Sequence, residues 1–149
     1  MAIKSDIIKE KLAKLVEFLR ELEKVKTASF EEYKSNPAIK RSCERLIQLV
    51  VESAADINSN VVIGLKDLPP KDYYETFIKA GEVKLISSKL SKKLAPWAGL
   101  RNRIVHEYAE IKDRLVFEKV EPTIDNFGEY VRQVEKFIES NTESEASNK

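Results

Sequence analysis

Apolar residues recur every three or four positions in each long segment of the chain, with lysine and glutamate between them. This spacing places the apolar side chains on one face of a helix, so it predicts amphipathic helices rather than strands. The first stripe lies between Ser5 and Lys26 and consists of Ile8, Leu12, Leu15, Leu19 and Leu22. The second follows Pro37, a residue suited to open a helix, and should end between residues 59 and 64. Its members are Ile39, Cys43, Leu46, Val50, Ala54 and Ile57.

Three further stripes follow the adjacent prolines at positions 69 and 70. The third stripe consists of Tyr73, Phe77 and Ala80, and Gly81 is expected to stop or bend its helix. The fourth begins near Val83, and Pro96 within it predicts a kink or a new start; its members are Ile86, Leu90, Leu94, Trp97 and Ile104. For the last stripe, Pro122 predicts a start or a break near the front. Its members are Val120, Ile124, Phe127, Val131, Val134 and Ile138.

Each stripe covers only one side of its helix, so the helices must pack on one another. We therefore predict one all-α domain over residues 1–140, an antiparallel bundle of four to five helices. Four glycines and five prolines are too few for a hairpin-rich β fold. Residues 27–36 are expected to form a polar connection. Residues 141–149 have nothing to bury and are expected to form a disordered tail.

Composition excludes several classes of function. There are 26 basic and 25 acidic residues, so no bulk charge draws the chain onto a polyanion or a membrane. The single cysteine, Cys43, excludes an intrachain disulfide framework, and the single histidine, His106, excludes the usual zinc clusters. We expect neither metal nor cofactor, and a packing role for Cys43. The amino terminus lacks the apolar core of a signal peptide, so a cytoplasmic protein is expected. Trp97 should lie in the core or in a dimer interface.

The segment LRNRIVHEY departs from the bundle pattern. Steps of seven residues take Leu94 to Arg101 and then to Tyr108, so a charged residue stands in line with a core-facing leucine. An unpaired buried guanidinium is costly, so Arg101 must pair with a carboxylate or face a water-filled cleft. Glu44 and Glu52 of the second stripe's helix are the candidate carboxylates. The sequence leaves both possibilities open.

Two other polar residues of this segment, Asn102 and His106, are four positions apart and share a helix face. On a straight helix, however, Arg101 and His106 diverge by about 140°. This divergence favours a site completed by a second copy of the chain across a dimer axis.

The residues Arg101, His106 and Tyr108 form the pattern R-x4-H-x-Y, and in this the chain resembles the HepT-like toxins, a branch of the HEPN superfamily of small helical ribonucleases. Asn102 matches the polar residue that commonly follows the arginine in that family. The likeness extends to residues 38–58, 72–83 and 115–138, which are similar to the family's second, third and last helices. The resemblance implies a HEPN-type bundle that forms a homodimer.

The resemblance also implies metal-independent cleavage of RNA at a cleft between two copies of the motif. Histidine titrates near neutral pH, so His106 could move a proton to or from a ribose or leaving-group oxygen. Arg101 could hold a phosphate through its planar fork, and Asn102 could orient the phosphate or the imidazole. Basic residues near the motif are candidates for contacts with the RNA backbone. They are Lys89, Lys92, Lys93 and Arg103.

The same resemblance implies a protein partner. It predicts a toxin–antitoxin pair of type II or VII, in which a nucleotidyltransferase antitoxin transfers AMP to Tyr108. Two other functions stay open from the sequence. One is a noncatalytic partner subunit that binds nucleotide or substrate for a nucleotidyltransferase. The other is a helical interaction protein, for which Arg101 should be buried in a salt bridge with no groove beside it.

Overall fold

The computed structural model describes residues 3–66, 68–107 and 110–147, and the regular structure within these ranges is entirely helical. The predicted all-α class is confirmed. Seven helices are present in the described residues, in the order α1 (Ser5–Val25), α2 (Phe30–Ser35), α3 (Pro37–Lys66), α4 (Tyr73–Glu82), α5 (Ser88–Leu94), α6 (Trp97–His106) and α7 (Asp113–Ser147).

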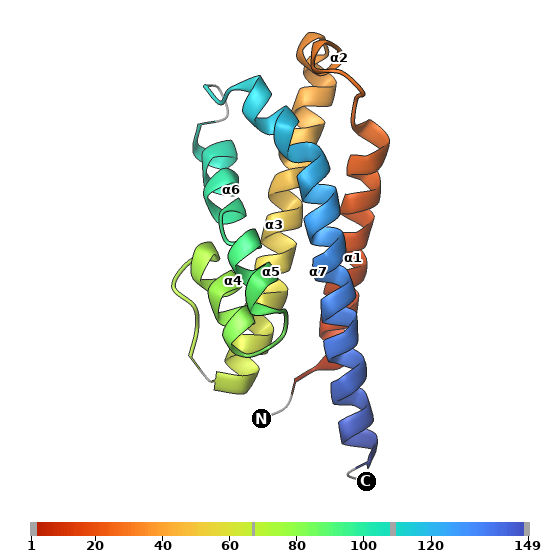
Figure 1. Ribbon diagram of the computed structural model, residues 1–149, viewed down its shortest axis with the longest axis vertical. Helices are drawn as coiled ribbons and strands as arrows, with labels where there is room; N and C mark the ends of the chain where they lie inside the picture. Colours follow the sequence, from red (N-terminus) through yellow and green to blue (C-terminus); the bar gives the residue numbers. More distant parts are fainter. Residues whose placement is uncertain (1–2, 67, 108–109, 148–149) are drawn as a thin grey trace.

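The three longest helices, α1, α3 and α7, run side by side along the long axis of the molecule (Figure 1). The shorter helices α4, α5 and α6 form a flank beside them, and α2 lies at one end (Figure 1). Within this arrangement α4 and α6 pack on α3, and α5 packs on α4 and α7. Helix α6, which carries the R-x4-H motif, therefore packs against α3 and α4 on one side and faces solvent on the other.

The core consists of the predicted stripes. All the members of the last stripe are buried except Ile124, which is partly buried and packs against the core. Phe127 lies at the centre of an aromatic cluster, with ring centroids 6.1 Å from Phe77 and 5.8 Å from Trp97. Trp97 is only 6% exposed, so it belongs to the core. Cys43 is fully buried, as expected for packing, and burial raises the pKa of its thiol to about 11.

A chain of buried polar groups links α7, α3 and α4. The Tyr130 hydroxyl donates to Asn58 Oδ1 at 2.6 Å, and Asn58 Nδ2 lies 3.4 Å from Thr76 Oγ1. The Thr76 hydroxyl in turn donates to the carbonyl oxygen of Tyr73 at 2.7 Å. Burial raises the pKa of Tyr130, so its hydroxyl stays protonated and remains a donor. These bonds fix the first turn of α4 against α3.

The prediction of a polar connection over residues 27–36 was wrong, because this segment contains the short helix α2. Ser29 accepts a hydrogen bond from the backbone N–H of Glu32 at 3.2 Å, and its own hydroxyl donates to the Glu32 carboxylate at 3.3 Å. This Ser-x-x-Glu spacing marks helix starts. Phe30 and Tyr33 then pack against Phe117 of α7, with ring centroids 5.5 Å away in each case.

Pro122 does not start or break the last helix. Helix α7 begins at Asp113 and continues through Pro122. Proline removes one backbone donor, but the buried residues on either side, Val120 and Thr123, anchor this turn in the core. Thr123 accepts from the indole N–H of Trp97 at 2.9 Å and donates to the Lys119 carbonyl at 2.6 Å. Tertiary packing therefore outweighs the local cost of the proline.

The other helix ends match the sequence in part. The break expected at Pro96 is confirmed, because α5 ends at Leu94 and α6 begins at Trp97. Helix α4 ends at Glu82, where Gly81 permits close packing: a Cβ there would lie 2.5 Å from the Ser91 Cβ. Helix α7 continues to Ser147 across most of the segment expected to be a disordered tail, because no glycine or proline follows Gly128. Residues 148–149 lie outside the described ranges.

Helix α3 is long and apolar enough to cross a membrane by length and mean hydropathy alone. However, 56% of the relevant window is buried inside the bundle, as is typical of a core helix.

Candidate functional site

Helix α6 presents the candidate residues because its buried face is firmly anchored. Leu100 and Ile104 are 8% and 3% exposed, and Trp97 is bonded to α7 as described above. The positions between these apolar residues point away from the core. Arg101 is partly exposed, whereas Asn102 and His106 are exposed.

Arg101 is held by three neighbours. Its Nε and Nη2 lie 2.9 Å and 2.8 Å from Oε2 of Glu52, and its Nη1 donates to Asn102 Oδ1 at 3.1 Å. The Tyr73 ring stacks on the guanidinium, 4.6 Å from ring centroid to Cζ. Gln48 Nε2 donates to the same Glu52 oxygen at 3.0 Å and helps to orient it.

The salt bridge considered from the sequence is therefore present, with Glu52 rather than Glu44 as the partner. Glu44 pairs instead with Arg41 at 3.2 Å, and burial raises the pKa of the Glu44 carboxyl. A guanidinium carries five N–H donors. Those of Arg101 that do not face Glu52 and Asn102 make no hydrogen bond to the described residues. They remain available to an anion.

His106 has different surroundings at the end of the same helix. It is the last residue of α6, and its exposed imidazole makes no hydrogen bond with the residues that the structure describes. Because α6 is regular from Trp97 to His106, the angle of about 140° between Arg101 and His106 persists in the folded chain. Within one chain, the Arg101 side chain therefore points towards α3 and α4, and the His106 side chain lies on another face of α6.

Two grooves border the Arg101 cluster. One of about 530 Å³ lies along α1 and α3 and includes Glu52 and Tyr73 in its wall. The other, of about 540 Å³, lies between the start of α4 and α6 and includes Tyr73 and Asn102. Arg101 itself lines neither groove, but Glu52, Tyr73 and Asn102, which hold its guanidinium, each line at least one of them. This arrangement differs from the one expected of a plain interaction protein, in which no groove would lie beside the salt bridge.

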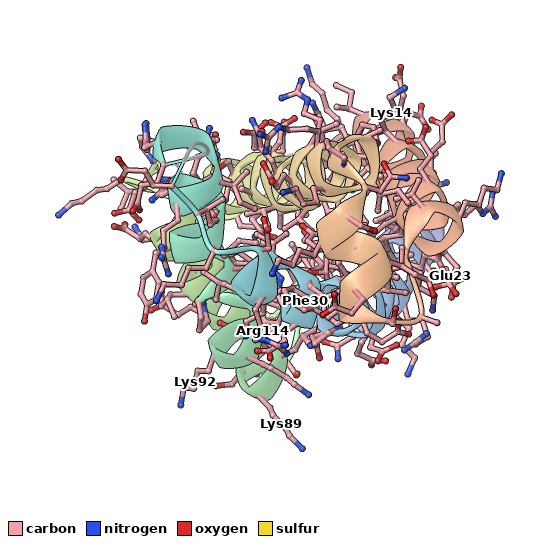
Figure 2. The ribbon with its side chains drawn as sticks, turned by 90° about the horizontal axis from the view of Figure 1, so that it is seen from above. Lys14, Glu23, Phe30, Lys89, Lys92 and Arg114 are labelled. Atoms are coloured by element: carbon pink, nitrogen blue, oxygen red, sulfur yellow. The ribbon has the colours of Figure 1, made fainter. Side chains whose placement is uncertain are left out.

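The four basic residues predicted to contact RNA neither hold Arg101 nor line either groove. Lys89, Lys92 and Lys93 are exposed on α5, and Figure 2 shows Lys89 and Lys92 projecting outward from the bundle. Arg103 is exposed on α6 and lies 3.6 Å from Glu107. Tyr108, the expected site of modification, lies outside the described residues.

Within the described ranges, no three side chains among histidine, cysteine, aspartate and glutamate gather to hold a metal ion. The arrangement offers anion binding through Arg101 and proton transfer through His106.

Sequence reasoning did not assign a site role to Tyr73 or Gln48. Tyr73 was counted only as a member of an apolar stripe, and its pairing with Arg101 depends on the approach of α4 to α6. The consecutive aromatic residues Tyr73 and Tyr74 were the available signal, since one helix face cannot bury both.

The family model described as Ribonuclease HepT-like matches residues 8–134, which is most of the chain. The chain belongs to the HepT-like ribonuclease family. This membership confirms the resemblance seen in the sequence and the expected class of enzyme, an endoribonuclease. A curated relative, the tRNA nuclease HepT of Aphanizomenon flos-aquae, is 33% identical over 132 residues, covering 89% of this chain and 90% of the relative.

Solved structures of HEPN toxins have the same fold. The tri-AMPylated HEPN toxin of Shewanella oneidensis, in complex with MNT antitoxin, matches with a TM-score of 0.79 at 23% identity. The match covers 88% of this chain and 98% of that toxin. YutE of Bacillus subtilis, described as a cytosolic protein of unknown function, matches with a TM-score of 0.79 at 12% identity, covering 93% of each chain.

Proposed function

We propose that this HepT-like chain is the metal-independent endoribonuclease toxin of a toxin–antitoxin pair. The observation that carries the proposal is the arrangement on α6, where residues that line two grooves hold the Arg101 guanidinium, and the exposed imidazole of His106 ends the same helix. Family membership supports the reaction class, because a relative that is 33% identical is a tRNA nuclease.

The residue chemistry fits cleavage by an internal nucleophile. The 2′-hydroxyl of RNA attacks the adjacent phosphorus, and the bond to the 5′-oxygen breaks. His106 takes the proton from the 2′-hydroxyl or gives one to the departing 5′-oxygen. The N–H groups of Arg101 that do not face Glu52 stabilise the charge that develops on the phosphoryl oxygens. Asn102 orients the phosphate or the imidazole.

A second copy of the chain completes the site in this proposal. The two side chains diverge around α6, and neither of them lines either groove of one chain. A two-fold axis would bring Arg101 of one copy opposite His106 of the other.

Cleavage of single-stranded RNA in the presence of a chelator tests the activity. Replacing His106 by alanine should abolish cleavage and leave the helical circular-dichroism spectrum unchanged, because the side chain is exposed and outside the core. Glu135→Ala, at an exposed position of α7, serves as the control. A purified wild-type chain that does not cleave RNA, or a His106→Ala variant that does, would contradict the proposal.

The proposed regulator is a nucleotidyltransferase antitoxin that transfers AMP from ATP to the Tyr108 phenol, with release of pyrophosphate. The likeness in fold to a toxin that is itself AMPylated and bound to an antitoxin supports this part. The added negative charge would repel RNA. Mass spectrometry after incubation with the enzyme and ATP should find AMP on the wild type and none on Tyr108→Phe. We expect the pair to act in the cytoplasm.

One observation favours the alternative of a noncatalytic binding subunit. Glu52 neutralises the Arg101 charge, as a structural salt bridge would. The RNA-cleavage assay separates the two functions, because a binding subunit would retain RNA or nucleotide without cutting RNA.

A further inference from the structure

We propose that the groove between the start of α4 and α6 is a subsite for one RNA base next to the cleaved phosphodiester, with Tyr74 as its stacking platform. This inference rests on the proposed ribonuclease function and names the part of the chain that binds a nucleotide. The groove has a volume of about 540 Å³ and is lined in part by Tyr73, Tyr74, Gly99 and Asn102.

The aromatic side chains of the groove suit a nucleobase. Tyr74 is 54% exposed, and it is one of few large apolar side chains left open to solvent in the described residues. Unpaired RNA bases stack on exposed aromatic rings, and this stacking tolerates any base. Tyr73 has a different role, because its ring already stacks on the Arg101 guanidinium. Consecutive tyrosines thus connect the groove wall to the phosphate-binding residue.

The polar groups of the groove complement the edge of a base. Asn102 Oδ1 accepts from Arg101, so the amide must turn its Nδ2 donors away from the guanidinium. Asp72, at the rim, accepts from the backbone N–H of Glu75 at 2.8 Å as the cap of α4. Lys71 lies beside it and is exposed. The groove therefore presents hydrogen-bond donors and a cation next to an aromatic surface.

The side of α6 that lines the groove also carries the candidate proton-transfer residue, His106. Gly99, Asn102 and His106 lie within about 60° of one another around α6, and His106 is about 6 Å further along the axis than Asn102. A base in the groove would place its own backbone near the end of α6. The subsite therefore adjoins the proposed reaction centre rather than a remote surface.

Gly99 offers a way to close the groove without disturbing the core. A Cβ at Gly99 would meet nothing within 4 Å, so a larger side chain can extend into the open space. Alanine at this position adds one methyl group and leaves nearly all of the volume, whereas phenylalanine places an aromatic ring in the groove and obstructs it. A comparison of Gly99→Ala with Gly99→Phe thus shows whether RNA binding requires an open groove.

The test measures binding of a single-stranded oligoribonucleotide that carries 2-aminopurine, using His106→Ala as the background so that the RNA stays intact. Tyr74→Ala should weaken binding about tenfold and reduce the stacking quench of 2-aminopurine, whereas Tyr74→Trp should retain both. Gly99→Phe should weaken binding to a similar extent, and Gly99→Ala should not. Leu68→Ala is the matched control, because Leu68 is 63% exposed and does not line this groove.

Unchanged binding in both Tyr74→Ala and Gly99→Phe would overturn the subsite, and so would an equal loss in Leu68→Ala. Melting temperatures of all variants should match that of the background, which excludes unfolding as the cause of weaker binding. Cleavage by the wild-type chain is scored separately. Its absence would refute the proposed enzyme, while quenching that depends on Tyr74 would still support a base-binding groove.

Discussion

Arg101 and His106 occupy the same helix, but the fold treats their side chains in opposite ways. The guanidinium is fixed by a carboxylate, an amide and an aromatic ring from three helices, and its side chain is 17% exposed. The imidazole is exposed at the last position of α6. In the proposed site, the fold would therefore orient the anion-binding group in advance within one chain. The orientation of the imidazole would be left to the substrate or to a second copy.

Among substitutions that test how Arg101 is held, Arg101→Lys should have the largest effect. Lysine keeps the charge but has no planar fork, so it cannot bond Glu52 through two nitrogens and still offer a fixed edge to a phosphate. We expect RNA cleavage to fall by about 10² to 10³-fold. Arg114→Lys is the matched control, because Arg114 also stacks on a ring, that of Phe30 at 4.2 Å (Figure 2). Its Nη1 lies 3.6 Å from a carboxylate oxygen of Glu118. Equal losses in the two variants would count against a special role for Arg101.

Mixing two inactive variants tests whether Arg101 and His106 act in one site from two different chains. If each site takes Arg101 from one copy and His106 from the other, a dimer of Arg101→Ala with His106→Ala retains one intact site. An equal mixture, once subunits have exchanged, should then recover about a quarter of the wild-type cleavage rate. If mass analysis finds the mixed dimer and cleavage stays absent, the two groups do not act across the dimer in this way.

Glu52→Gln should show whether Glu52 positions the Arg101 guanidinium for cleavage or only stabilises the folded chain. Glutamine keeps the shape but removes the charge that competes with a phosphate for Arg101. We expect kcat to fall about tenfold while KM for RNA stays level or decreases, because binding is eased and orientation is lost. Glu75→Gln breaks an ion pair with Lys79 of similar exposure on α4 and should change neither constant. A rise in KM with unchanged kcat would contradict the positioning role.

The fold was predictable from the sequence where periodicity decides it, and less so where tertiary contacts do. The stripes in α1, α3 and α7 are buried as expected because a one-sided apolar helix has few ways to pack. Pro122 shows the limit, since the packing of Val120 and Thr123 keeps a helix intact where the local rule predicts a break. The missed α2 had its own local signal at Ser29 and Glu32.

The surroundings of Arg101 were predictable only in part. The motif picks out Arg101, Asn102 and His106 as candidates, and the need to neutralise a charge in line with the core indicated a glutamate of the second stripe's helix, such as Glu44 or Glu52. The choice of Glu52 over Glu44 depends on which turn of α3 lies opposite α6, and spacing along the chain does not encode that approach. The position of the Tyr73 ring over Arg101 likewise depends on a tertiary contact, because Asn58 and Thr76 hold α4 against α3.

The smallest expected effect concerns Tyr73, whose ring stacks on the Arg101 guanidinium. A cation stacked on a partly exposed ring is stabilised by about 0.5 to 1 kcal/mol, so Tyr73→Leu should lower kcat/KM by about two- to fivefold. Tyr73→Phe keeps the ring and should behave like the wild type. Because Tyr73 also lines the groove beside Asn102, the comparison should be repeated in a Gly99→Phe background, in which the added side chain obstructs that groove. A loss that persists there assigns the effect to the guanidinium, whereas a loss in Tyr73→Phe would assign it to the hydroxyl and contradict the stacking argument.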